Sequence, residues 1–64
     1  MTLYIPLPAC FRFKKIYDKS EILQRWLTPD HRVISVWYIE DCADLKKLRG
    51  MLNDNRIRFT IKDQ

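Results

Sequence analysis

Glycine is almost absent from this chain of 64 residues, which contains one glycine, three prolines and two cysteines. A chain with one glycine has no glycine-rich loop that could cradle the phosphates of a nucleotide. The same composition excludes collagen-like repeats and flexible linkers. Two cysteines allow at most one disulfide, and two free thiols are ordinary inside a cell. The composition therefore indicates a domain held together by its hydrophobic core.

Residues suited to catalysis or metal binding are also scarce. The single histidine, His31, leaves little basis for a Ser-His-Asp or Cys-His arrangement. Cys10, His31 and Cys42 lack the paired spacing of a structural zinc site. Asp41 and Asp44 are typical of helix caps rather than of an acid/base pair. We therefore expect a binding protein without metal or cofactor, and not an enzyme.

Long hydrophobic runs are missing as well. No segment approaches the roughly 18 apolar residues that a membrane-spanning helix needs. The N-terminal stretch "MTLYIPLPACFRFKK" has no basic residue before its apolar part, and two prolines interrupt it, which is not typical of a signal peptide. We expect a cytoplasmic protein in a reducing environment, with no membrane association.

The residues that are present favour one small, basic domain spanning 1–64. Hydrophobic residues make up 47% of the chain, so it is not compositionally disordered. The formal net charge is +4, which favours acidic partners such as nucleic acid or an acidic protein surface. A charge of this size is equally compatible with a role in solubility alone.

The hydrophobic periodicity predicts an α/β domain, with α+β as the alternative class. The predicted elements are an optional N-terminal edge strand at 3–7, a strand at 10–16, a helix at 18–27, a central strand at 32–40, a helix from a cap at 41 to a stop at 53–55, and a final strand within 55–64. This β-α-β-α-β order predicts a three- to four-stranded sheet with two helices on one face. Short connections after the helices predict parallel neighbouring strands.

Two of the predicted strands alternate between apolar and cationic residues. In "NRIRFTIKDQ", Ile57, Phe59 and Ile61 point to one side and the cations point to the other. "CFRFKKI" alternates in the same way. If the helices cover the apolar side, the opposite side of the sheet gathers a set of cations, namely Arg12, Lys14, Arg56, Arg58 and Lys62.

Trp37 decides what such a surface could bind. On the open side it would place an indole among cations, which is the composition of a platform for single-stranded nucleic acid. On the helix side it would be a core residue, which is the commoner position for tryptophan in a strand of this kind. We expect a regulatory protein that binds nucleic acid, or a nucleic-acid-handling machine, through these cations with Trp37 as the anchor.

A protein partner is the alternative. An apolar patch of Val33, Trp37 and Ile39 rimmed by arginine is also typical of an interface core. The chain would then be an inhibitor or adaptor, of viral or mobile-element type, that blocks a larger protein. Formation of a homodimer through the same face is a third outcome.

Cys42 lies at a predicted helix N-terminus, where the helix dipole lowers the pKa of a thiol. The run "VWYIEDCADLKKLRGMLNDNRIRF" resembles the strand, cysteine-bearing turn and helix of a glutaredoxin. This resemblance implies thiol-redox activity at Cys42. Leu45 stands where dithiol members of that family have a second cysteine, and 64 residues leave no chain for the later strands. We therefore expect Cys42 to be a structural thiol.

Overall fold

The computed structural model describes residues 1–40 and 44–63. Its elements are, in order, β1 (Thr2–Tyr4), α1 (Ala9–Lys19), α2 (Glu21–Trp26), β2 (Leu27–Pro29), β3 (Val36–Ile39), α3 (Leu45–Asp54) and β4 (Thr60–Lys62). The strands form one open sheet in the order β2-β3-β1-β4, and each neighbouring pair is antiparallel. The predicted small α/β fold is confirmed.

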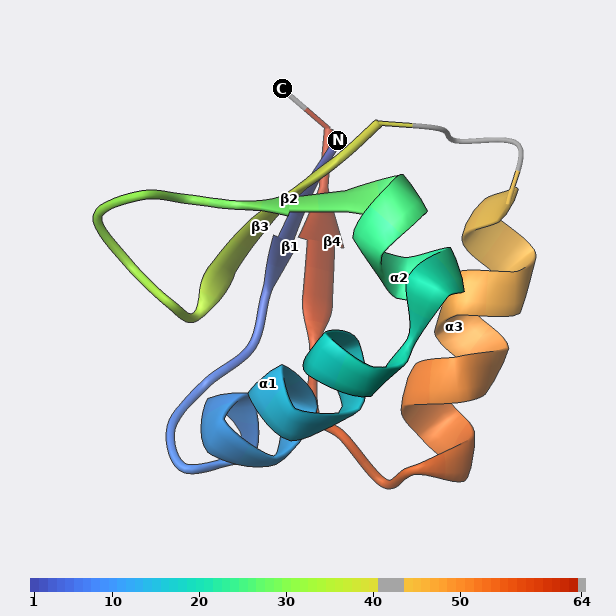
Figure 1. Cartoon of the computed structure of the whole chain (residues 1–64), viewed down its shortest axis with the longest axis horizontal. Helices are drawn as coiled ribbons and strands as arrows, with labels where there is room; N and C mark the ends of the chain where they lie inside the picture. The colour runs from blue at the N-terminus through green and yellow to red at the C-terminus, as the bar shows by residue number, and fades with distance from the viewer. Residues whose placement is uncertain (41–43, 64) are drawn as a thin grey trace.

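The connectivity follows from where the helices cross the sheet. The segment α1–α2 connects β1 to β2, and β3 lies between those two strands. Helix α3 connects β3 to β4, with β1 between them. Taking α1–α2 as one helical crossover, this is the β-α-β-β-α-β order of the ferredoxin-like, or split βαβ, arrangement. The helices pack against one side of the sheet (Figure 1).

The segment 10–16, which was predicted as a strand, is instead part of α1. Its alternation is real, but Cys10, Phe13 and Tyr17 also recur at the three- and four-residue spacing of a helix. Cys10 and Phe13 are buried in the core, and Tyr17 packs against it. Phe11, the residue that only a strand would have covered, is 56% exposed. The strand prediction here was wrong because the segment fits both periods and tertiary packing selects the helix.

The loss of that strand changes the pairing of the others. The N-terminal segment, predicted as an optional edge strand, is the inner strand β1 between β3 and β4. Strands β2 and β3 follow each other closely in the chain and pair antiparallel. The prediction of parallel neighbours was therefore wrong, because it depended on a strand at 10–16.

Helix α2 begins three residues later than the helix predicted at 18–27. Asp18 lies inside α1, where its carboxylate forms an ion pair with Lys14 Nζ at 2.6 Å. The cap is Ser20, which has extended backbone angles and whose Oγ accepts a hydrogen bond from the Leu23 amide at 3.2 Å. This extended residue separates α1 from α2, and it allows Leu23 and Trp26 to be buried.

Candidate functional site

One side of the sheet is not covered by the helices. Leu3 of β1 and Trp37 of β3 point to the helices and are buried, so their neighbours along each strand point the other way. This surface, called the open face below, is formed by Tyr4, Thr28, Val36, Tyr38, Thr60 and Lys62. Thr2 has the same orientation in the sheet but is only 4% exposed.

Two tyrosines dominate the open face. Tyr4 is 40% exposed on β1 and Tyr38 is 39% exposed on β3. In the register of the two strands Thr2 is opposite Tyr38 and Tyr4 is opposite Val36. The tyrosines are therefore diagonal neighbours, at a separation of about 7–8 Å for such pairs. Two phenol rings thus lie side by side on the inner strands of the sheet.

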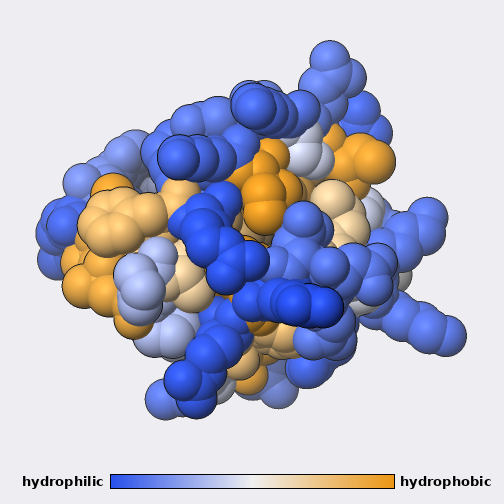
Figure 2. Space-filling model, turned by 90° about the horizontal axis from the view of Figure 1, so that it is seen from below, coloured by the Kyte–Doolittle hydropathy of each residue, from blue (hydrophilic) through white to orange (hydrophobic). Residues whose placement is uncertain are grey.

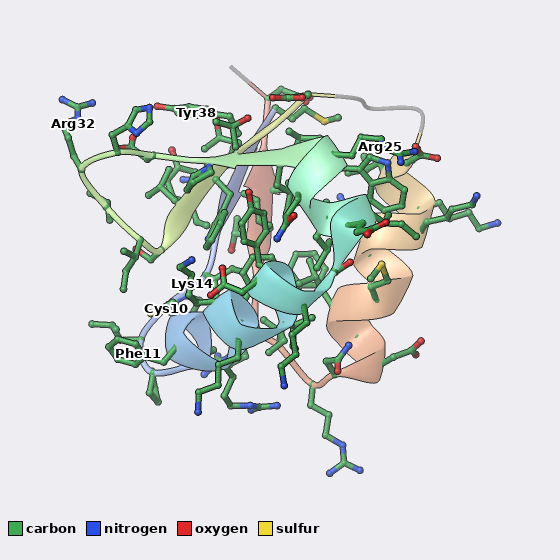
Figure 3. All side chains as sticks on the ribbon, in the orientation of Figure 1. Cys10, Phe11, Lys14, Arg25, Arg32 and Tyr38 are labelled. Carbon is green, nitrogen blue, oxygen red and sulfur yellow. The ribbon has the colours of Figure 1, made fainter. Side chains whose placement is uncertain are left out.

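Tyr38 is held by a carboxylate at the end of β2. Its Oη donates a hydrogen bond to Asp30 Oδ2 at 3.1 Å, and Asp30 Oδ1 accepts one from the Arg32 amide at 2.7 Å. The bond from the Arg32 amide is the main cause that lowers the pKa of Asp30, and the Tyr38 hydroxyl adds to it. The bond to Asp30 and its negative charge raise the pKa of Tyr38. Figure 3 labels Tyr38 and Arg32 at this end of the sheet.

Tyr4 has a cation at its ring. Lys62 Nζ lies 5.5 Å from the centroid of the Tyr4 ring, across the pairing of β1 with β4. Within residues 1–40 and 44–63 the ammonium group forms no ion pair. Lys62 is therefore the predicted cation that the structure places on the open face beside an exposed aromatic ring.

Three of the other predicted cations gather at one end of the molecule. Arg56 and Arg58 line an open depression of about 450 Å³ between the end of α3 and the start of β4. Arg12 Nη2 donates a hydrogen bond to the backbone oxygen of Asn55 at 2.6 Å, which places α1 beside this segment. Arg12, Arg56 and Arg58 are called the arginine cluster below. Figure 2 views this end, where hydrophilic side chains cover most of the surface around smaller hydrophobic patches.

Lys14 is separate from the arginine cluster. Spacings of three and four residues put Lys14, Phe11 and Asp18 on one side of α1, whereas Arg12 lies on the other. Lys14 is paired with Asp18 and lies 5.6 Å from the Tyr17 ring centroid. The predicted cations therefore do not form a single sheet face, because two of them are on a helix and two are in the connection that precedes β4.

Trp37 is a core residue and not a surface anchor. Its side chain is 0% exposed and its ring lies 5.0 Å from Phe13 and 4.6 Å from Tyr17, centroid to centroid. The prediction of Trp37 as a contact residue was wrong. The apolar patch that included Val33 and Ile39 is absent for the same reason, since Ile39 is buried with Trp37.

Tyr4 and Tyr38 are the site residues that sequence reasoning missed. The signal for Tyr38 was its alternation with Trp37, because a strand that buries Trp37 must turn Tyr38 outward. The signal for Tyr4 was weaker. It lies in a segment with Pro6 and Pro8, which favoured an optional edge strand rather than an inner one.

The remaining candidates are thiols and metal ligands. Cys10 is buried and is not in a disulfide. Cys42, the residue on which the glutaredoxin resemblance rests, lies outside the described residues. No group of three or more His, Cys, Asp or Glu side chains is placed to hold a metal ion in the described ranges.

Comparisons with known proteins do not identify a relative of this chain. The chain matches no protein-family model, no curated protein and no solved structure. Within residues 1–40 and 44–63, no helix has the length and apolar character needed to cross a membrane.

Proposed function

We propose that the protein binds single-stranded nucleic acid on the open face of its sheet. Tyr4 and Tyr38 would each stack on a base, and Lys62 would contact a phosphate. The observation that carries this proposal is the pair of exposed tyrosine rings on neighbouring inner strands, two residues apart in register. Single-strand-binding modules with a four-stranded sheet use exposed aromatic rings in this way to stack two or three bases.

The energies of the competing contacts favour stacking. A cation over an aromatic ring at an exposed site contributes about 0.5–1 kcal/mol, whereas a base stacked on an aromatic side chain contributes about 1–3 kcal/mol. A base can therefore displace Lys62 from the Tyr4 ring. The released ammonium group is then free to contact a phosphate next to the stacked base.

The dimensions of the sheet indicate the length and the strandedness of the nucleic acid that the open face would bind. Its strands have three or four residues, so the open face is about 10–14 Å long in the strand direction. Such a face fits the two or three bases that similar platforms stack. Bases inside a duplex cannot lie flat on tyrosine rings, so the partner is single-stranded. The topology itself does not indicate a function, because this arrangement of strands and helices serves many functions.

Removing the rings tests the proposal. We expect Tyr4→Ala and Tyr38→Ala each to weaken binding of a fluorescent oligouridylate or oligothymidylate by about 5- to 150-fold, the loss of one stacked base. Tyr4→Phe and Tyr38→Phe keep the ring and should retain most of the affinity. Fluorescence anisotropy at low salt measures both.

Phe11→Ala is the matched control for the tyrosine variants. Phe11 is also an exposed aromatic residue, but it lies on α1 away from Tyr38 (Figure 3). Its removal should leave the affinity unchanged. The proposal is wrong if the unmodified protein does not bind either oligonucleotide at low salt, or if Phe11→Ala weakens binding as much as the tyrosine variants do.

A protein partner is the second candidate function. Leu7, in the connection from β1 to α1, is 68% exposed, and Phe11, four residues later in α1, is 56% exposed. Exposed apolar side chains so close together are typical of an interface. Under this candidate the chain is an inhibitor or adaptor that contacts an acidic protein surface, or a homodimer. Light scattering tests the homodimer, and Phe11→Ala should then abolish it while the tyrosine variants should not.

A further inference from the structure

We infer that the bound nucleic acid crosses the open face on a diagonal from Tyr38 to Tyr4. It then continues past the edge strand β4 onto the arginine cluster. Arg12, Arg56 and Arg58 would there hold the phosphates of further nucleotides. This inference rests on the proposed function, because it assumes that the tyrosines stack bases. It adds a second contact region, a path and a longer binding site.

The register of the sheet defines the path. Tyr38 on β3 is opposite Thr2 on β1, and Tyr4, two residues further along β1, is opposite Thr60 on β4. Arg58 lies two residues before Thr60 in the chain, which is the direction in which β1 runs from Thr2 to Tyr4 because β1 and β4 are antiparallel. Each step from Tyr38 to Tyr4 to Arg58 thus moves one strand across and two residues along. A single-stranded nucleic acid that stacks on both tyrosine rings is therefore directed at the arginine cluster.

The arginine cluster has the properties of a phosphate site. Arg56 and Arg58 border the depression of about 450 Å³ together with Asn53 and Phe59. Arg12 reaches the backbone oxygen of Asn55, next to Arg56. In the part of the chain that the structure describes, none of the three guanidinium groups forms an ion pair. Their charges are therefore available, and guanidinium is well suited to phosphate oxygens.

The opposite edge of the sheet is less suited to a phosphate backbone. The Glu40 carboxylate accepts a hydrogen bond from the Thr28 hydroxyl, and Asp30 binds the Tyr38 hydroxyl. Arg32 lies 3.7 Å from Asp30 and offsets that one charge. At the β4 edge the two carboxylates that adjoin in sequence, Asp54 and Asp63, are outnumbered by four cations, which are Lys62 and the three residues of the arginine cluster. The charge distribution thus favours exit over β4.

The backbone of Arg56 supports a role for its side chain. Arg56 has φ of 56°, the left-handed conformation that favours glycine. The preceding residue, Asn55, ends α3 with a φ of −93°. An arginine here destabilises the fold relative to glycine. The guanidinium group accounts for a residue that the backbone alone would not favour.

A length series of oligothymidylates tests the inference. Chains from about two to about sixteen nucleotides span the site sizes of single-strand platforms. The affinity of the unmodified protein should rise beyond about three nucleotides, the length that the sheet can stack. The double variant Arg56→Ala, Arg58→Ala should bind the shortest chains almost normally and lose about tenfold affinity for the longest.

Arg25→Ala,Lys47→Ala is the matched control for this double variant. It removes the same number of charges from exposed side chains, on α2 and α3, and Figure 3 shows Arg25 away from the segment that connects α3 to β4. It should bind long chains as the unmodified protein does. Equal losses in the two double variants, or an affinity that does not rise with length, would overturn the inference and leave the sheet site standing. Absence of binding at every length would instead overturn the proposed function.

Arg56→Gly separates the charge from the fold. Glycine relieves the left-handed backbone, so the variant should unfold at a higher temperature than the unmodified protein. It also removes a phosphate contact, so it should bind the longest oligothymidylate several-fold more weakly. Unchanged affinity in Arg56→Gly would contradict the inference even if its Tm rises.

Discussion

Tyr38 shows how a single residue connects the fold to the proposed site. Its ring is exposed on the open face, while its hydroxyl is bound to Asp30 in the connection that follows β2. Asp30 in turn accepts the amide of Arg32. One carboxylate thus fixes the start of the β2–β3 connection and the orientation of an exposed ring, without contributing to the core.

Replacing Asp30 tests this connection through the titration of Tyr38. Because the bond to Asp30 is the main cause that raises the pKa of Tyr38 above its ordinary value of 10.0, Asp30→Ala should return that pKa towards 10.0. Absorbance of the ionised phenol during an alkaline titration measures the change. Tyr38→Phe identifies the signal that belongs to Tyr38. A titration that is identical in Asp30→Ala and the unmodified protein would show that the hydrogen bond is not formed in solution.

The same pair gives the pH dependence of stability a definite sign. The pKa of Asp30 is lower in the folded chain than its ordinary value of 3.8. Its contribution to the free energy of unfolding is therefore present above pH 3.8 and is lost as the pH falls through the folded pKa. The pKa of Tyr38 is higher in the folded chain than its ordinary value of 10.0. Its contribution to the free energy of unfolding is therefore present below pH 10.0 and is lost as the pH rises through the folded pKa. Asp30→Ala should weaken both dependences.

At the scale of the element, Ser20 separates two helices. Its Oγ accepts the Leu23 amide, which would otherwise be an unpaired donor in the first turn of α2. Ser20→Ala should reduce the free energy of unfolding by about 1 kcal/mol, whereas Ser20→Gly should reduce it by only a few tenths. Urea denaturation followed by circular dichroism measures both. Equal losses in the two variants would mean that the hydroxyl does not act as a cap.

The elements also show which features can be predicted from sequence. A helix ending at 53–55 was predicted from its hydrophobic period, and in α3 Leu45, Leu48 and Leu52 pack in or against the core. The final strand was predicted to alternate, and Ile57 is buried whereas Arg58 is exposed. These segments have one dominant period. The segment 10–16 has two, and its own residues do not decide between them.

The candidate site was harder to predict than the fold class, because it depends on long-range pairing. The outward position of Tyr38 follows from the inward position of Trp37, and no local pattern decides which side of β3 the helices cover. Tyr4 becomes a site residue only because β1 pairs with both β3 and β4. Arg12 joins Arg56 and Arg58 through a contact between α1 and the end of α3. Composition indicated aromatic residues and cations but not which of them meet.

At the scale of the whole molecule, the proposed function predicts that stacking and charge make separable contributions to the affinity for a single strand. Each phosphate contact releases counterions, so the logarithm of affinity for a single strand falls with the logarithm of salt concentration, with a slope of about −0.7 per contact. Lys62 and the three residues of the arginine cluster together predict a slope of about −3 for a long oligonucleotide. Stacking on Tyr4 and Tyr38 releases no counterions and should not affect the slope.

Salt titrations of the variants should therefore divide into two groups. Arg56→Ala, Arg58→Ala should reduce the slope by about 1.4, since two phosphate contacts are lost. Tyr4→Ala should lower the affinity by a similar factor at every salt concentration and leave the slope unchanged, since it removes only stacking. If the tyrosine variant flattens the slope as much as the arginine variant does, the two surfaces do not have the separate roles that their residues imply. Binding would then be a general attraction between a basic protein and a polyanion.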